Sequence, residues 1–234
     1  MTACISCQSA YAQKQVDTQH LVWTRYSLKA ALNERYHLRQ EIENRVYWPT
    51  WQQHQFVVRT FAERKLSEGW GSGLGFTYFR QTLPHAPDAE NYTVRTELRP
   101  QLEVSYSQRL REKLSLHHRY WTEFRFFEQA GGGFAYGHNR TRYKLEVRYA
   151  VSGRTTLLAF DEIHLNIGRQ VALNIFDQNR YGASVKYQAS PALGAELGYL
   201  NWYQQRASGT DFYNRHILRA TLHHFINLKK ATSP

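Results

Sequence analysis

Eight polar residues in the last third of the chain lie close enough in sequence to form one binding site. They are Asp161, Glu162, Asp177, Asn179, Arg180, Gln205, Arg206 and Asp211. Their carboxylate and amide oxygens could hold a small polar ligand or a calcium ion, which prefers oxygen ligands. The alternative, which we favour, is a hydrogen-bonded plug that fixes long loops to a wall. Both interpretations place these residues together at one rim of the fold, as a rim polar cluster.

Motifs for catalysis or metal binding are missing from the sequence. The chain contains no His-x-Ser, Gly-x-Ser-x-Gly, His-Glu-x-x-His or Walker sequence. The adjacent pairs His117-His118 and His223-His224 point to opposite faces of a strand, so their members are poor joint metal ligands. We therefore expect no catalytic residue, no metal site and no cofactor.

Apolar and polar side chains alternate along most of the chain. Between residues 92 and 106, one face carries Val94 and Leu102 while the other carries Arg95 and Glu97. Strict alternation over this length indicates a strand with one apolar and one polar face. Eleven ranges show the pattern: 22–30, 36–48, 55–66, 74–81, 92–106, 114–126, 142–151, 156–167, 180–189, 193–204 and 215–226.

Two stretches, 28–45 and 108–118, also fit an amphipathic helix, but their alternation is clearer than their helical pattern.

Charges of both signs fall on the polar face of the strands. In a narrow barrel that face lines the interior, where long side chains of opposite charge can pair. We predict a lumen ion-pair network of Arg39, Glu41, Arg45, Arg95, Glu97, Arg99, Glu103, Arg119, Glu123, Arg125, Glu146 and Arg148.

The connections between the predicted strands also alternate in length. Tight turns near 67–69, 111–113, 152–154 and 190–192 are separated by longer loops at 84–91, 128–140, 168–178 and 206–214. Short turns at one end and long loops at the other are typical of outer-membrane barrels. We predict an all-β fold, an antiparallel up-and-down transmembrane β-barrel of about 10–12 strands. Single-chain bacterial barrels have even strand numbers, so we expect ten or twelve strands.

Composition favours a barrel over a nucleic-acid-binding protein. The formal net charge is +11, aromatic residues make up 15% of the chain, and the mean hydropathy is −0.63. Nucleic-acid binding uses a basic face with exposed aromatics, whereas here the basic face is nearly as rich in Glu. No apolar run of about 18 residues exists, so no transmembrane helix is expected. We expect tyrosines and tryptophans to ring the outside of the barrel.

The N-terminal residues have the character of a processed leader. Ala10-Tyr11-Ala12 is a small-x-small pattern that suits signal peptidase, although a basic region and a long apolar region are missing. We interpret residues 1–12 as the remnant of a signal peptide and residues 13–234 as a single barrel domain. An ordinary cytoplasmic N-terminus or a lipoprotein signal ending at Cys4 are the alternatives. Cleavage after Ala12 would remove both cysteines and exclude thiolate chemistry.

The last third of the chain carries a family resemblance. It contains the segments AFDEIHLNIG at 159–168, NIFDQNR at 174–180, LGYLNWYQQRA at 197–207 and DFYNRH at 211–216. This succession resembles the bacterial domain-of-unknown-function family 2490, whose members look like outer-membrane barrels. The resemblance extends over about residues 18 to 228. It implies a barrel fold and a location in the outer membrane, and it supplies no catalytic residues that could be assigned to this chain. The tail at 229–234 departs from the aromatic end of many outer-membrane barrels.

The expected function is that of a barrel in the bacterial outer membrane with a polar, ion-paired, largely plugged lumen and a structural or narrow-transport role. Its expected partners are membrane lipid, lipopolysaccharide (a further candidate ligand of the rim polar cluster) and the barrel-assembly machinery. No nucleic-acid partner is expected, and the oligomeric state is open. A barrel enzyme acting on lipid and a soluble β-barrel that binds a ligand are the alternatives.

Overall fold

The computed structural model describes residues 14–228, so the leader expected at 1–12 and the tail at 229–234 lie outside the described residues. The described chain forms one long strand in each of the eleven ranges where alternation was found. The strands are β1 (Val16–Ala31), β2 (Tyr36–Tyr47), β3 (Gln53–Ser67), β4 (Trp70–Leu83), β5 (Thr93–Arg109), β6 (Leu114–Glu128), β7 (Phe134–Ala150), β8 (Thr155–Ile167), β9 (Phe176–Gln188), β10 (Leu193–Gln205) and β11 (Phe212–Asn227).

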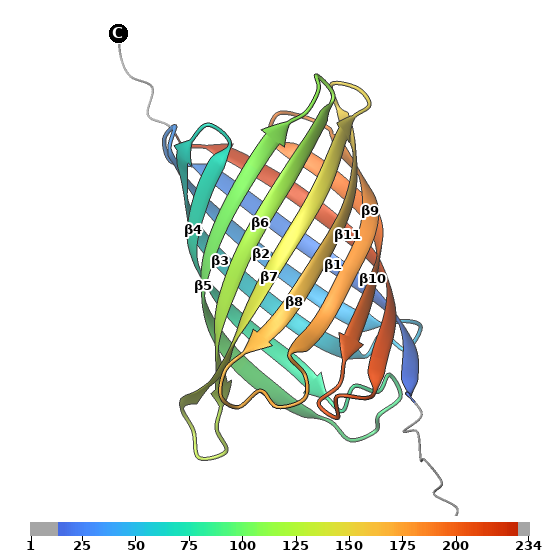
Figure 1. Cartoon of the computed structure of the whole chain (residues 1–234). Coiled ribbons are helices and arrows are strands. Elements are labelled where there is room, and N and C mark those ends of the chain that lie inside the picture. The colour runs from blue at the N-terminus through green and yellow to red at the C-terminus, as the bar shows by residue number, and fades with distance from the viewer. Residues whose placement is uncertain (1–13, 229–234) are drawn as a thin grey trace, which may run out of the picture.

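The strands close into one barrel (Figure 1). Each strand pairs antiparallel with the next along the chain, and β1 pairs with β11 to complete the wall. The all-β, up-and-down barrel is therefore confirmed, but the expected even strand number is wrong, because eleven strands form the wall. With an odd number, the first and last strands run in the same direction, so the β1–β11 seam is parallel.

The two mouths of the barrel differ in their connections. At one, here called the short-turn mouth, the strands are joined through 32–35, 68–69, 110–113, 151–154 and 189–192. At the other, the long-loop mouth, they are joined through 48–52, 84–92, 129–133, 168–175 and 206–211. The long loop expected at 128–140 is wrong, because β7 begins at Phe134 and Gly132 and Gly133 make a tight turn with φ of 86° and 77°.

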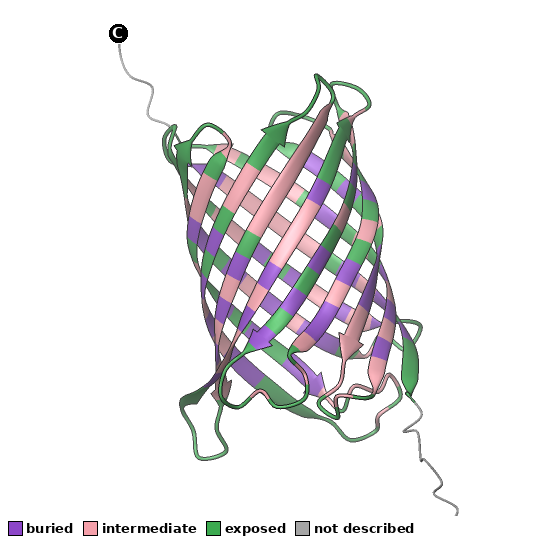
Figure 2. Cartoon of the chain, viewed as in Figure 1, coloured by how far each residue is buried: buried purple, intermediate pink, exposed green. Residues whose placement is uncertain are grey.

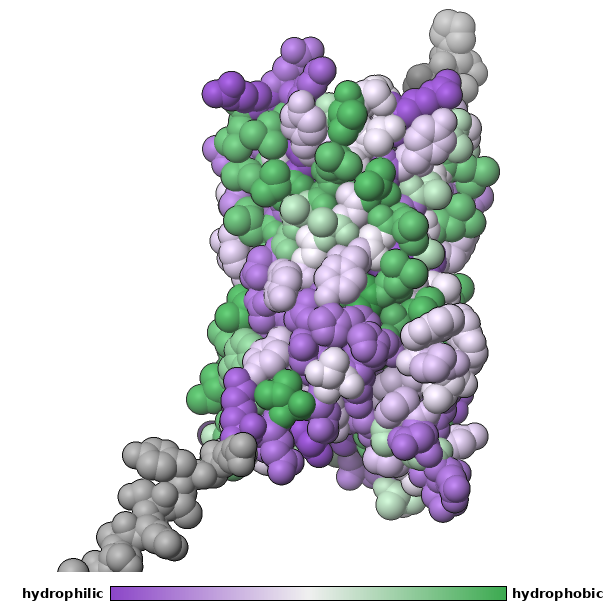
Figure 3. Space-filling view, turned by 90° about the vertical axis from the view of Figure 1, so that its right-hand side faces the viewer, coloured by the Kyte–Doolittle hydropathy of each residue, from purple (hydrophilic) through white to green (hydrophobic). Residues whose placement is uncertain are grey.

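The two faces of the wall have opposite character. Outward-facing side chains such as Leu74, Leu102, Leu197 and Leu218 are apolar and exposed, while the buried positions carry mainly polar and charged groups. Buried and exposed positions alternate along the strands (Figure 2). On the face shown in Figure 3, hydrophobic side chains gather toward the short-turn mouth and hydrophilic ones lie nearer the long-loop mouth. Within residues 14–228, no helix has the length and apolar character to cross a membrane.

One part of the interior is apolar. Leu21, Trp23, Tyr47, Leu200, Trp202 and Ile217 form a buried cluster on the strands that flank the parallel seam. The expectation that tryptophans ring the outside is wrong for Trp23, Trp121 and Trp202, which are buried inside. These three side chains occupy inward positions of their strands, where their ring faces lie against arginine guanidinium groups.

Candidate functional site: a charged lumen

Each of the twelve residues predicted for the lumen ion-pair network has an oppositely charged partner within 4.0 Å. The alternation of each strand turns these side chains inward. They form several separate groups, however, because inward positions on distant strands lie at different heights along the barrel. Two of these groups hold most of the buried carboxylates.

The first group surrounds Glu97 and Glu123, whose side chains are fully buried. Arg125 and Arg99 lie 2.9 and 2.8 Å from Glu97. Arg140 lies 2.5 Å from Glu123, which Arg142 also contacts and toward which Arg99 points at 3.7 Å. This group holds more guanidinium groups than carboxylates, so it is net positive.

The second group is built on β2 and β3. Arg39 contacts three carboxylates, those of Glu41 at 3.2 Å, Glu63 at 2.5 Å and Glu103 at 2.8 Å. Arg59 joins this group through Glu41 at 3.2 Å. Arg45 pairs with Glu43 on the same strand. The group is nearly balanced in charge and lies between β2, β3 and β5.

Three parts of the lumen were not named in the predicted network. Arg140 was assigned to a loop, although it lies on β7 and binds Glu123 and Asp177. Arg142 is its inward neighbour two positions later. Glu196 also lies inside and pairs with Arg219 at 3.1 Å. Extending the alternation of 142–151 toward the N-terminus, as far as residue 134, would have placed Arg140 on the inward face.

The structure brings together only part of the predicted rim polar cluster. Asp161 and Glu162 are adjacent on β8 and therefore face opposite sides of the wall. Asp161 is exposed outside and accepts a hydrogen bond from Asn179 at 3.0 Å. Glu162 is buried inside, where it pairs with Arg119 at 2.7 Å.

Four other members of that cluster line one cavity in the long-loop half of the lumen: Asp177, Arg180, Gln205 and Arg206. Asp177 is an extra residue at the β8–β9 register shift and turns inward to Arg140 at 3.0 Å. Arg180 lies deeper in the lumen, whereas Gln205 and Arg206 line its long-loop end. Asp211 stays in the connection 206–211, where Ser208 donates a hydrogen bond to it at 3.0 Å.

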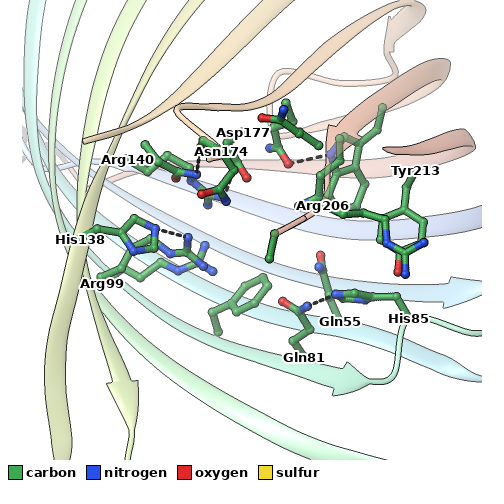
Figure 4. A pocket seen from close by; sticks show the side chains of 18 of the residues that line it. Gln55, Gln81, His85, Arg99, His138, Arg140, Asn174, Asp177, Arg206 and Tyr213 are labelled. Atoms are coloured by element: carbon green, nitrogen blue, oxygen red, sulfur yellow. Dashed lines mark hydrogen bonds and ion pairs between the residues drawn. The ribbon is translucent and has the colours of Figure 1, made fainter. Parts of the chain in front are cut away.

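Side chains divide the lumen into cavities. The first, of about 430 Å³ and drawn in Figure 4, is lined by residues of the long-loop connections such as His85 and Arg206 and opens toward that mouth. The second and third, of about 460 and 520 Å³, lie toward the short-turn mouth. Four residues line both the first and the second cavity and so separate them: Arg45, Arg59, Arg142 and Arg180. We call these four residues the arginine waist.

Tryptophan rings pack against three of the four arginines of the waist, Arg45, Arg142 and Arg180. The guanidinium carbon of Arg45 lies 3.8 Å from the Trp23 ring centre, and that of Arg142 lies 4.5 Å from the Trp121 ring centre. A guanidinium group over an indole face gains electrostatic attraction and loses rotational freedom. The waist is therefore a constriction at which guanidinium groups from several strands meet.

The loop 84–92 folds into the long-loop mouth. The Gln81 amide donates a hydrogen bond to His85 Nε2 at 2.6 Å (Figure 4), and the Gln19 amide donates one to the His85 carbonyl at 2.7 Å. Burial, followed by the charges of Arg215 and Arg95, lowers the pKa of His85 from 6.5 to about 3. His85 is thus neutral at physiological pH, and its loop narrows the entrance to the first cavity.

The first cavity is strongly cationic. Of the described residues that line it, nine are arginines and Asp177 is the one carboxylate. Charged clefts of one sign attract ions of the other sign, more strongly where low-dielectric walls focus the field. The described residues contain no group of three or more His, Cys, Asp and Glu side chains arranged to hold a metal ion. The cavity is therefore suited to small anions.

An apolar outer wall, a closed ring of strands and a charged interior define a β-barrel of the transmembrane class. The chain belongs to the DUF2490 family, described as protein of unknown function, whose family model matches residues 21–214. This match confirms the predicted family. A search of the curated proteins found no match. Among solved structures, the one titled "NanC porin structure in rhombohedral crystal form" matches with a TM-score of 0.48 and 14% sequence identity, covering 81% of this chain and 85% of that chain.

Proposed function

We propose that this protein is a narrow channel of the bacterial outer membrane for small anionic solutes, closed at rest by the arginine waist and the loop 84–92. The observation that carries the proposal is the position of the waist. It separates a cavity that opens toward one mouth from cavities that open toward the other. A small movement of a few side chains would join them into one path.

The outer wall supports the proposed location. Exposed leucine, valine and tyrosine side chains surround the barrel, as lipid contact requires. Barrels of the outer membrane have short periplasmic turns and longer extracellular loops. We therefore propose that the short-turn mouth faces the periplasm and that membrane lipid and lipopolysaccharide surround the wall. Assembly by the barrel-assembly machinery belongs to the same proposal.

The size of the barrel supports a narrow path. Barrels of eight strands fill with side chains, and barrels of about sixteen enclose open aqueous channels. Eleven strands lie between these limits, and paired arginine and glutamate side chains are buried inside the barrel. The proposed role is transport without catalysis. An assay for hydrolysis of lipid A and phospholipids tests the proposed absence of catalysis.

Planar-bilayer recording tests the channel. The wild-type protein should give small, intermittent currents that favour anions over cations. Arg142→Ala should enlarge the current, since Glu123 keeps Arg140 as a partner at 2.5 Å. Arg154→Ala removes the same charge from the short-turn side of the second cavity, away from the waist, and should change the current little. A steady, large, cation-indifferent conductance of the wild-type protein would show a general diffusion pore instead.

A further inference from the structure

Arg180 has an unusual environment for a buried cation. Its side chain extends from β9 into the arginine waist, is 9% exposed and lines both the first and the second cavity. Within residues 14–228, no hydrogen-bond acceptor and no carboxylate within 4.0 Å is found for it, and its Nε has no partner. Its guanidinium carbon lies over the rings of Trp202 and Trp23, 4.5 and 5.4 Å from their centres.

The carboxylate best placed to neutralise Arg180 is already occupied. Glu162 lies directly opposite Arg180 in the β8–β9 register. One of its oxygens is bound by Arg119 at 2.7 Å, and the other lies 3.1 Å from His164 Nε2. A buried charge without a partner is costly. The free guanidinium therefore favours any small anion that can enter the lumen.

The groups around Arg180 add to its positive field. Arg45 and Arg142 belong to the same waist. Arg215 is fully buried, and its guanidinium carbon lies 4.3 Å from the centre of the same Trp202 ring. It is hydrogen bonded to the neutral amide oxygens of Gln19 and Gln204 and not to a carboxylate. Two guanidinium groups beside Trp202 therefore lack acidic partners.

We propose that Arg180 is the anchor of a binding site for one small oxyanion, carried by a carboxylate or a phosphate group, where the first cavity meets the arginine waist. The planar guanidinium can donate two parallel hydrogen bonds to such a group. A cavity of about 430 Å³ has space for an organic acid as well as for an inorganic ion. The inference deepens the proposed function, because it names the chemical group that an anion channel would bind.

Calorimetric titration of the purified barrel in a nonionic detergent tests the site. Sodium phosphate and sodium benzoate are titrated separately, in a fixed background of sodium chloride at constant ionic strength. Binding of phosphate would identify the ligand as an inorganic ion, and binding of benzoate would identify it as an organic acid. In either case, binding must saturate at about one anion per barrel. Absence of saturable binding of both anions to the wild-type protein would overturn the proposal.

Matched variants locate the site. Arg180→Gln should weaken binding at least tenfold, and Arg180→Lys, which keeps the charge without the planar fork, should weaken it less. Arg148→Gln is the control, since it also removes a lumen arginine, but one that pairs with Glu146 and lines the second and third cavities. Equal binding by wild type and Arg180→Gln, or equal loss in Arg180→Gln and Arg148→Gln, would contradict the assignment.

Thermal unfolding provides a second measurement. In chloride alone, Arg180→Gln should unfold at the same temperature as wild type or higher, because it removes an unpaired buried charge. Phosphate or benzoate should raise the unfolding temperature of the wild type and not that of Arg180→Gln. A variant that fails to fold would overturn the proposal, since Arg180 would then have a structural partner. Saturable binding without any bilayer current would reject the channel and keep the site.

Discussion

Glu97 and Arg125 form a two-point ion pair between β5 and β6, with Arg125 Nη2 3.0 Å from Glu97 Oε1 and Arg125 Nε 3.0 Å from Glu97 Oε2. The same Oε2 accepts hydrogen bonds from Arg99 Nε at 3.0 Å and Nη2 at 2.8 Å. One buried carboxylate therefore satisfies two guanidinium groups. The pair therefore links β5 to β6 through side chains inside the barrel, in addition to the backbone hydrogen bonds of the wall.

Glu97→Gln should destabilise the folded barrel by about 3 kcal/mol or more, because removing one partner of a buried pair leaves the other charge uncompensated. Urea unfolding in lipid vesicles, followed by tryptophan fluorescence, measures the free energy of unfolding. Glu68→Gln, in the exposed turn 68–69, is the control and should have almost no effect. Equal stability of the two variants would mean that water in the lumen screens these charges.

Leu102→Arg tests which face of the wall meets lipid. Leu102 lies in the middle of β5, faces outward and is 50% exposed. An arginine near the bilayer midplane costs roughly 2–4 kcal/mol. Leu110→Arg places the same change in the turn 110–113 and should cost far less in the same vesicle-folding measurement. A barrel that tolerates both changes equally is not held in lipid at Leu102.

Gly75→Val tests the packing of an aromatic ring against the inner wall. A Cβ at Gly75 would overlap the ring of Phe61, which is fully buried and packs against Trp121 at a centroid distance of 5.2 Å. The added side chain should cost about 1–3 kcal/mol of stability by displacing that ring. Gly153→Val has open space around it and should leave the thermal unfolding temperature within a degree or two of wild type. A similar loss in both variants would point to backbone effects instead.

Acid should release the loop 84–92. The pKa of His85 is about 3 with the loop in place and 6.5 in its absence, so the released state binds the proton more readily between these values. The inserted loop therefore loses stability as the pH falls below 6.5, by about 2 kcal/mol at pH 5. Protease cleavage within 84–92 should become faster at pH 5 than at pH 7. His85→Gln should abolish that difference, and a pH dependence that persists in this variant would assign it to another group.

The alternation of side chains was sufficient to predict the strands and their faces. In β5 the sequence places Val94, Leu98 and Leu102 on one side and Glu97 and Arg99 on the other, and the barrel keeps that division. The pattern is strong because one face meets an apolar exterior and the other a charged interior along the whole strand. Nearly every strand carries the same local signal.

Features that depend on the whole ring could not be predicted in this way. The parallel closure of β1 on β11 follows from the strand count, and no local pattern encodes it. The register shift beside His164 turns Asp177 inward, which strict alternation cannot anticipate. The sequence also does not show which arginine lacks a carboxylate partner. Glu162 pairs with Arg119 on β6 and not with Arg180, its register neighbour on β9.

The parallel seam has a consequence for topology across a membrane. Val16 begins β1 at the long-loop mouth, and Asn227 ends β11 at the short-turn mouth. In a barrel with an even number of strands, both of these points would lie at the same mouth. In the proposed membrane location, a reporter domain fused ahead of β1 and another fused behind β11 would therefore be held in two different aqueous compartments, covalently linked through the wall.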